Sequence, residues 1–399
     1  MTELDQALKT LQQLKEVTSF EALAIKSTTI DDQGNDMDII ANQVQQLLAE
    51  GCQHQSTDWA AHMTTSIGNE SLIGQILSSL HNGNLLSPEL YPVLNALKNQ
   101  TLDWLCDVFE QNHGHFTAGA SYGNLEALWQ AKQRYPNRDT VYLAQTAHYS
   151  IYKACQILGL TCQPIATDNE DKVNLKQLSA ACQVKQPLAI IATAGTASTG
   201  TFDPIGDCIK LANQIDTWCH IDAAWGGHLK LLPEHQDLFE KPGFQANSIC
   251  FDPHKAWGQP KPCSVLLYQQ PVNLMLSIEA DYLQQQPNNR LPGSQGGESF
   301  LPLWFTLVSS GVETLRQSSR FTLEQAQFFS ARLNELTNWP TFTSPSGIVC
   351  FETNKNLDKL LQQGILSTAK RNNKEVYRAV FANKQINAKA LIEKLQPYL

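Results

Sequence analysis

The chain has 399 residues, of which 42% are hydrophobic and 17% are charged. This composition is typical of a folded globular protein with a large core, and it excludes the disordered and fibrous classes. The 29 basic and 38 acidic residues give a net charge of −9. Because no basic stripe interrupts this balance, we exclude nucleic acid and membrane surfaces as partners.

The start of the chain predicts two helices. Between Thr2 and about Leu48, apolar residues recur at intervals of three and four, which is the spacing of a helix face. The first stripe is Leu4, Leu8, Leu11 and Leu14, and the second is Ile40, Val44, Leu47 and Leu48. The first residues also lack the basic region and apolar core of a signal peptide. We therefore assign residues 1–60 to an N-terminal helical arm that packs on, or exchanges with, another subunit.

The middle of the chain alternates between strand and helix patterns. After two helices between Leu72 and Phe109, short apolar runs are separated by amphipathic segments, such as Asn124 to Gln133 and Ile205 to Asn213. This alternation predicts an α/β fold with a mainly parallel sheet and helices on both faces. The predicted strands are Thr140 to Ala144, Leu188 to Thr193, Trp218 to Ile221, Ser248 to Phe251 and Ser264 to Tyr268.

The remaining sequence predicts a second, smaller domain. A long helix is expected from Trp304 towards Leu336, followed by strands in SGIVCFET and EVYRAVFAN. We assign residues 61–305 to a large domain and residues 306–399 to a small α+β domain. Ten cysteines are scattered without CxxC pairs or metal-ligand spacing, which predicts reduced thiols, no metal site and a cytoplasmic protein.

Three polar motifs follow predicted strands or open predicted helices. FTAGASYGNLEAL, from Phe116, is a loop of small residues that runs into a helix, and such a helix start can bind a phosphate. His148 lies between a strand and a helix, and a run of glycines and hydroxyls that includes Thr196 follows another strand. Each motif alone has an ordinary structural interpretation, as a helix cap or a loop.

Two charged residues lie at the ends of neighbouring strands. Asp222 ends the apolar strand in WCHIDAAWGG, where a poorly solvated carboxylate needs a cationic partner or hydrogen-bond donors. The glycines Gly226 and Gly227 indicate that something bulky lies close. Lys255 follows His254 after the next strand, and it is either a surface cation or a buried amine.

Taken together, these features match the requirements of pyridoxal 5'-phosphate. The cofactor needs an amine for its Schiff base, a carboxylate for its ring nitrogen, an anion site, and a flat group above the ring. Because the carboxyl ends of parallel strands meet at one edge of a sheet, we expect the five motifs to meet there.

From about Ile67 to its C-terminus, the chain resembles the group II pyridoxal-phosphate-dependent amino-acid decarboxylases. The matching motifs are ASYGNLEAL, GTASTGTFDPI, HIDAAWGG and DPHK. The family includes glutamate, aromatic-amino-acid, cysteine-sulfinate and diaminobutyrate decarboxylases. The resemblance implies the fold type I architecture and a homodimer with shared active sites.

The resemblance also implies a role for each site residue. Lys255 would form the Schiff base, Asp222 would pair with the ring nitrogen, and His148 would stack on the ring and help to protonate the carbanion. The cofactor contacts would further include Ala120, Ser121, Thr196, Ala224 and His254. Burial beside a cationic ring would lower the pKa of Lys255 and make its amine nucleophilic. From the partner subunit, His81 and Asn84 would line the substrate pocket.

Two departures from the family pattern leave the proton donor and the substrate open. The region after Tyr282 is short and has no further tyrosine before Trp304, although many relatives carry a catalytic tyrosine in this loop. Glu298 stands where relatives usually have an arginine. We expect decarboxylation of an L-amino acid, with a lean towards a short acidic or polar substrate.

Four alternatives are distinguished by products or by colour. The chain could be another fold type I lyase, an oxidative deaminase that depends on decarboxylation, or an aminotransferase that binds a carboxylate through Arg378. The family also has an arginine at that position in a small-domain strand, which favours a structural role. A catalytically silent binding partner is the alternative from a different class, and it conflicts with the presence of both Lys255 and Asp222.

Overall fold

The computed structural model describes residues 9, 36–50, 56–239, 245–270, 290–372 and 374–399. The chain divides into two compact units, Met1–Ser56 and Thr57–Leu399. In the first unit, helix α2 (Met37–Glu50) confirms the second predicted helix. The first predicted stripe, from Leu4 to Leu14, lies outside the described residues.

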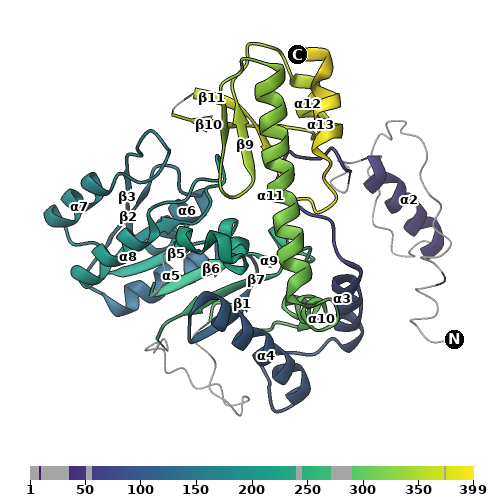
Figure 1. The fold of residues 1–399 in the computed structure, drawn as a ribbon. Helices are drawn as coiled ribbons and strands as arrows, with labels where there is room; N and C mark the ends of the chain where they lie inside the picture. The colour runs from purple at the N-terminus through teal and green to yellow at the C-terminus, as the bar shows by residue number, and fades with distance from the viewer. Residues whose placement is uncertain (1–8, 10–35, 51–55, 240–244, 271–289, 373) are drawn as a thin grey trace. The chain divides into compact units, whose positions relative to one another are not determined.

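The second unit is built around a sheet of seven strands in the order β1-β7-β6-β5-β4-β2-β3 (Figure 1). From β6 through β5, β4 and β2 to β3, each strand runs parallel to its neighbour. Strand β7 runs antiparallel to both β6 and β1. The strands are β1 (His113–Thr117), β2 (Thr140–Ala144), β3 (Thr161–Ile165), β4 (Ala189–Thr193), β5 (Trp218–Asp222), β6 (Ser248–Phe251) and β7 (Ser264–Tyr268).

All five predicted strands are confirmed, and β1 and β3 are additional. Neither additional strand has the apolar run of a central strand: β1 reads HGHFT, and β3 reads TCQPI with most of its residues exposed or half-buried. Both lie at the edges of the sheet, where each strand has a neighbouring strand on one side only.

The central strands β2, β4, β5, β6 and β7 are buried at every position because both faces of the sheet are covered. In β2, Val141 and Leu143 belong to one hydrophobic cluster, while Tyr142 and Ala144 belong to another. Burial on both faces explains why these strands show no alternation between polar and apolar residues. The helices that follow the strands are α5 (Ala120–Arg134), α6 (Tyr149–Leu158), α7 (Leu175–Val184) and α8 (Ile205–Gln214).

Two helices precede the sheet, and two more follow it. The first pair is α3 (Asn69–His81) and α4 (Pro92–Phe109), which confirms the helices expected in this region. The single long helix expected after Trp304 is instead two helices, α10 (Leu301–Ser309) and α11 (Gly311–Leu336). They separate at Gly311, whose φ of 77° is outside the helical range.

A second sheet of four antiparallel strands, in the order β10-β11-β9-β8, packs on α11 (Figure 1). Strands β9 (Ile348–Phe351) and β11 (Lys374–Val380) confirm the two strands predicted in the tail. The division of the chain at residues 60 and 305 stays a prediction. The other elements of this part are β8 (Thr341–Thr343), β10 (Ser367–Arg371), α12 (Asp358–Gln362) and α13 (Ala388–Leu395).

Close packing brings the loops after β4 and β5 together. A Cβ atom on Gly226 would lie 2.5 Å from the carbonyl oxygen of Ala194, and one on Gly227 would lie 2.4 Å from the Phe251 ring. The bulky groups indicated by these glycines are therefore parts of the protein. Among the helices that the structure describes, none has the length and apolarity needed to cross a membrane.

Candidate active site

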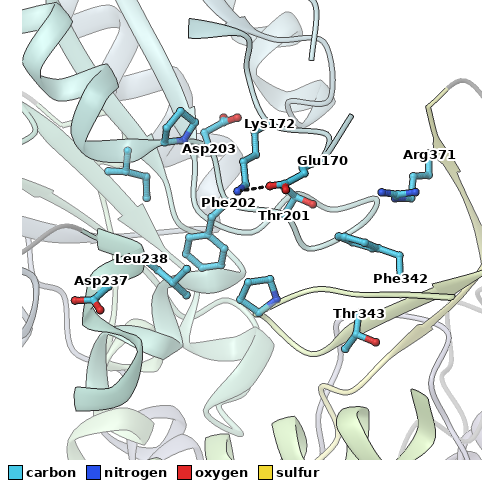
Figure 2. Close-up of a pocket in the computed structure, with 13 residues that line it drawn as sticks. Glu170, Lys172, Thr201, Phe202, Asp203, Asp237, Leu238, Phe342, Thr343 and Arg371 are labelled. Carbon is cyan, nitrogen blue, oxygen red and sulfur yellow. Dashed lines mark ion pairs between the residues drawn. The ribbon is translucent and has the colours of Figure 1, made fainter. Parts of the chain in front are cut away.

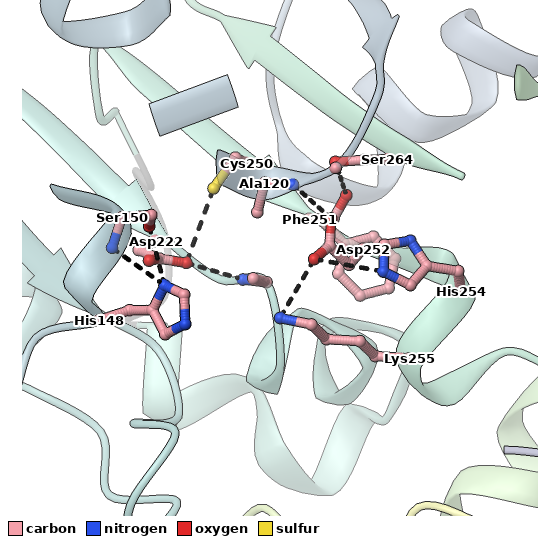
Figure 3. A network of polar contacts seen from close by, with 12 residues as sticks. Ala120, His148, Ser150, Asp222, Cys250, Phe251, Asp252, His254, Lys255 and Ser264 are labelled. Carbon is pink, nitrogen blue, oxygen red and sulfur yellow. Dashed lines mark hydrogen bonds and ion pairs between the residues drawn. The ribbon is translucent and has the colours of Figure 1, made fainter. Parts of the chain in front are cut away.

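A cavity of about 400 Å³ lies at the carboxyl ends of the parallel strands. Its walls come from the start of α5 and from the segments that follow β2, β4, β5 and β6. Of the ten predicted site residues, seven line it: Ala120, Ser121, His148, Asp222, Ala224, His254 and Lys255. The structure thus gathers at one edge of the sheet residues that are separated by more than one hundred positions in the sequence (Figure 3).

Lys255 is held by a carboxylate that the sequence reasoning missed. The lysine lies in the short helix α9 (Pro253–Ala256), which directly follows β6 and Asp252. Its Nζ is 3.1 Å from Oδ2 of Asp252, and its side chain is 23% exposed. Asp252 could have been noticed because a carboxylate at the end of an apolar strand requires a partner.

Burial and two neighbouring carboxylates determine the pKa of Lys255. Burial lowers this pKa, but the charges of Asp252 and Asp222 outweigh burial, so the pKa lies above its usual value. Lys255 is therefore an ammonium near pH 7 here, and it must lose a proton before it can act as a nucleophile. The expectation of a lowered pKa applies to the lysine beside the cationic ring of the cofactor, and it stays a prediction.

Asp252 also ties Lys255 to the start of α5. Its Oδ1 accepts a hydrogen bond from the backbone N–H of Ala120, at 2.9 Å. Gly119, which precedes the helix, provides no side-chain cap, so Asp252 satisfies an N–H group of the first turn from a distant strand. His254 lies beside it, with Nε2 3.7 Å from Asp252 Oδ2. Burial, followed by the charges of Lys255 and Lys261, lowers the pKa of His254 below its usual value.

Asp222 ends β5 and is surrounded by neutral donors. Its Oδ2 accepts a hydrogen bond from Nδ2 of Asn124 at 3.1 Å, and its Oδ1 accepts one from the backbone N–H of Ala224 at 3.2 Å. The Cys250 thiol lies 3.7 Å from Oδ1. These contacts orient the carboxylate without neutralising it.

His148 forms the N-cap of α6. Its Nδ1 is 2.8 Å from the hydroxyl of Ser150 and accepts from the Ser150 backbone N–H at 3.3 Å. Burial lowers the pKa of His148, and the charge of Lys255 adds to this effect. The ring is therefore neutral near pH 7.

Three predicted residues do not line the cavity of this chain. Thr196 is fully buried and bonds to the hydroxyl of Thr199 at 3.1 Å, while its neighbours Gly195 and Ala197 line the cavity. His81 ends α3, and Asn84 donates to the Ser294 hydroxyl at 3.2 Å. Their predicted place in a partner's pocket stays a prediction.

A second cavity, of about 550 Å³, lies between the loops after β3 and β4 and the strands β8 and β10 (Figure 2). Both of its cations have acidic partners: Lys172 Nζ is 2.6 Å from Glu170 Oε2, and Arg371 Nε is 3.3 Å from Asp171 Oδ2. The buried Asp203 carboxylate accepts backbone N–H groups on both oxygens. This cavity therefore lacks the lysine and aspartate arrangement of the first.

We predict that Asp252→Asn lowers the pKa of Lys255, because it removes the nearest opposing charge. The measurement is the pH dependence of Lys255 acylation, followed by mass spectrometry of the modified peptide. Half-maximal labelling should move to lower pH. Asp237→Asn, at an exposed carboxylate of the second cavity, is the control and should leave the midpoint in place. An unchanged midpoint in Asp252→Asn would show that Asp252 does not control the lysine.

Comparison with known proteins identifies the family. Residues 21–354 match the pyridoxal-dependent decarboxylase conserved domain. A probable L-tyrosine/L-aspartate decarboxylase of Methanosphaerula palustris is 32% identical over 222 residues, which cover 54% of this chain and 60% of the relative. An L-2,4-diaminobutyrate decarboxylase of Rhizobium meliloti is 32% identical over 243 residues, which cover 57% of this chain and 48% of the relative. The matched regions thus span about half of these relatives' length.

Solved structures share the fold. Catharanthus roseus tryptophan decarboxylase superimposes with a TM-score of 0.85 at 19% identity, covering 99% of this chain and 96% of that one. The glutamate decarboxylase domain of a Vibrio parahaemolyticus protein superimposes with a TM-score of 0.82 at 19% identity, covering 99% of this chain and 93% of that one. The predicted fold type I architecture is confirmed, and the chain belongs to the pyridoxal-dependent decarboxylase family.

Proposed function

We propose that the protein uses pyridoxal phosphate to decarboxylate an L-amino acid, releasing carbon dioxide and the corresponding amine. The observation that carries this proposal is the meeting of Lys255 and Asp222 in one cavity, in a chain of the decarboxylase family. Lys255 lies in α9 and Asp222 ends β5. Asp222 already has donors in Asn124 and Ala224, so it does not need the lysine as a partner.

The cavity suits the cofactor in polarity and shape. Two buried polar atoms of its wall, Nε1 of Trp225 and Oγ1 of Thr193, have no hydrogen-bond partner in the described protein. At the start of α5, a Cβ on Gly119 would meet nothing within 4 Å, so space remains beside the helix N-terminus. A phosphate fits there, next to Ser121, because helix starts attract anions.

Each residue has a task that its geometry supports. When bound, pyridoxal phosphate supplies a sink for the electron pair that remains after carbon dioxide leaves. Asp222 would keep a proton on the ring nitrogen, since a buried carboxylate stabilises a cation beside it. Asp252, 3.1 Å from Lys255 Nζ, would hold the lysine in place and stabilise its protonated form.

The substrate class follows from the relatives as a proposal. Their names include aspartate, tyrosine and diaminobutyrate, which supports the lean towards a short acidic or polar amino acid. The aminotransferase alternative loses support from Arg378, which is buried and donates to the carbonyl of Ala61 at 3.2 Å. We also propose a cytoplasmic location, since nine cysteines of the described residues are free thiols.

We predict that the purified protein shows an absorbance band at about 420 nm, as expected of a Schiff base of the cofactor. We also predict that it releases carbon dioxide from at least one candidate amino acid. The candidates are L-aspartate, L-2,4-diaminobutyrate, L-glutamate and L-tyrosine. Lys255→Ala should lose the band and lower turnover by about a thousandfold or more.

The same assay separates the alternatives. Release of a keto acid without carbon dioxide would indicate an aminotransferase. An aldehyde and ammonia together with carbon dioxide would indicate oxidative deamination. A colourless protein after incubation with the cofactor would remove the enzymatic proposal and favour a silent binding partner.

We further propose a homodimer in which α3 meets a second copy of the chain. Five apolar side chains of this helix are between 38% and 52% exposed, which is unusual for a face that meets only water. They are Leu72, Ile73, Ile76, Leu77 and Leu80. His81 ends the same helix and Asn84 follows it three residues later, which supports their proposed place in a partner's pocket.

Ile76→Asp should therefore convert the dimer to monomers, because it would bury a carboxylate in an apolar contact. Sedimentation velocity of the variant and the unmodified protein measures this. Ile157→Asp, at an exposed isoleucine of α6, is the matched control and should remain dimeric. An unmodified protein that sediments as a monomer at micromolar concentration would contradict the proposed dimer.

A further inference from the structure

A chain of buried hydrogen bonds runs beneath the cavity and begins at Trp218. The indole Nε1 lies 2.9 Å from the hydroxyl of Ser248, whose oxygen is 2.8 Å from Nδ1 of His220. An indole N–H can only donate. The Ser248 oxygen therefore accepts from Trp218, and it retains a proton and a second lone pair for His220.

His220 connects Ser248 to Asn124 in this chain of hydrogen bonds. Because Oδ1 of Asn124 can only accept, a neutral His220 ring carries its proton on Nε2, and its Nδ1 accepts from the Ser248 hydroxyl. Burial lowers the pKa of His220 to about 4, so the ring carries one proton at physiological pH. Nε2 lies 2.8 Å from Oδ1 of Asn124 and donates to it. The Cys250 thiol also donates to Oδ1, at 3.0 Å.

Asn124 is the branch point of the chain. With Oδ1 accepting from His220, both N–H groups of Nδ2 point the other way, one to Asp222 Oδ2 at 3.1 Å and one to the Ser150 hydroxyl at 2.9 Å. A reversed amide would place its oxygen against the carboxylate and its N–H groups against a donor. Asn124 is completely buried, so this reversal has no water to compensate it.

The branch ends at His148. The Ser150 backbone N–H donates to Nδ1 of His148, at 3.3 Å. Nδ1 therefore carries no proton, so the Ser150 hydroxyl, 2.8 Å away, donates to it as well. Nδ1 therefore accepts two hydrogen bonds, and a neutral His148 carries its proton on Nε2.

We propose that Asn124 and Ser150 are positioning residues that orient the Asp222 carboxylate and hold His148 neutral, with its proton on Nε2. This inference rests on the proposed decarboxylase function and assigns His148 a narrower role in it. A neutral imidazole that gives up its Nε2 proton becomes an anion, which is unfavourable near pH 7. His148 is therefore a stacking group and hydrogen-bond donor, and the proton that the product requires comes from another group.

Charged neighbours act on His148 from several elements. Burial is the largest influence and lowers its pKa, and the cations Lys255 and Lys153 act in the same direction. The carboxylates Asp222 and Asp252 act in the opposite direction. A hydrogen bond donated to Nδ1 favours the neutral ring, so removing it should raise the pKa of His148.

The test is NMR of the cofactor-loaded protein labelled with carbon-13 and nitrogen-15 in histidine only. The His148 signals are identified by their loss in His148→Gln. In the unmodified protein, both His148 and His220 should show the Nε2–H tautomer. In Ser150→Ala, His148 should become a mixture of tautomers and titrate at higher pH, and kcat should fall about fivefold to tenfold with little change in KM.

Two further variants separate a positioning role from a merely structural one. Ser150→Thr retains the hydroxyl and should restore the tautomer, while Ser309→Ala, at an exposed serine of α10, should change nothing. An Nδ1–H tautomer in the unmodified protein, or an unchanged His148 signal in Ser150→Ala, would overturn the proposal. Failure of the proposed function shows separately, as absence of the cofactor absorbance band.

Discussion

The candidate site depends on the two contacts that the Asp252 carboxylate makes. One oxygen accepts the Ala120 N–H at the start of α5, and the other lies 3.1 Å from Lys255 Nζ. A helix start, a strand end and the lysine are thereby fixed to one side chain. Because Asp252 is 2% exposed, losing one partner would leave a buried charge unpaired, which is far more costly than losing a surface ion pair.

A second set of polar contacts lies deeper, beneath Asp222 and His148. The side chains of this set from Trp218 through Ser248 and His220 to Asn124 carry no formal charge. They therefore avoid the free-energy cost of burying ions. Their order comes from donor and acceptor chemistry: an indole at one end can only donate, and a carboxylate at the other can only accept. Fully satisfied polar networks of this kind hold side chains in one arrangement.

Much of the fold could be predicted from the sequence because the sheet is covered on both faces. Continuous apolar runs such as SVLLY and the alternation with helices indicated the central strands correctly. Edge strands β1 and β3 escaped prediction because they lack the continuous apolar run of a central strand. The break between α10 and α11 was missed, since one glycine in a helical pattern has several interpretations.

For the site, the residue types and their positions at strand ends were informative, and seven of ten predicted residues line one cavity. The partners of those residues were harder to predict. Asn124 was expected only as the start of an amphipathic segment, because hydrogen bonds between distant segments leave no local pattern. For Asp252, its position at the end of an apolar strand was the one available signal. The balance of charges that raises the pKa of Lys255 likewise depends on how two strand ends meet.

The central claim is that Lys255 is the residue that binds the cofactor covalently. Borohydride reduction of the protein loaded with pyridoxal phosphate, followed by digestion and peptide mass spectrometry, tests it directly. We expect a reduced pyridoxyl group on the peptide that contains Lys255 and no label there in Lys255→Ala. A label on another lysine, or none at all, would contradict it.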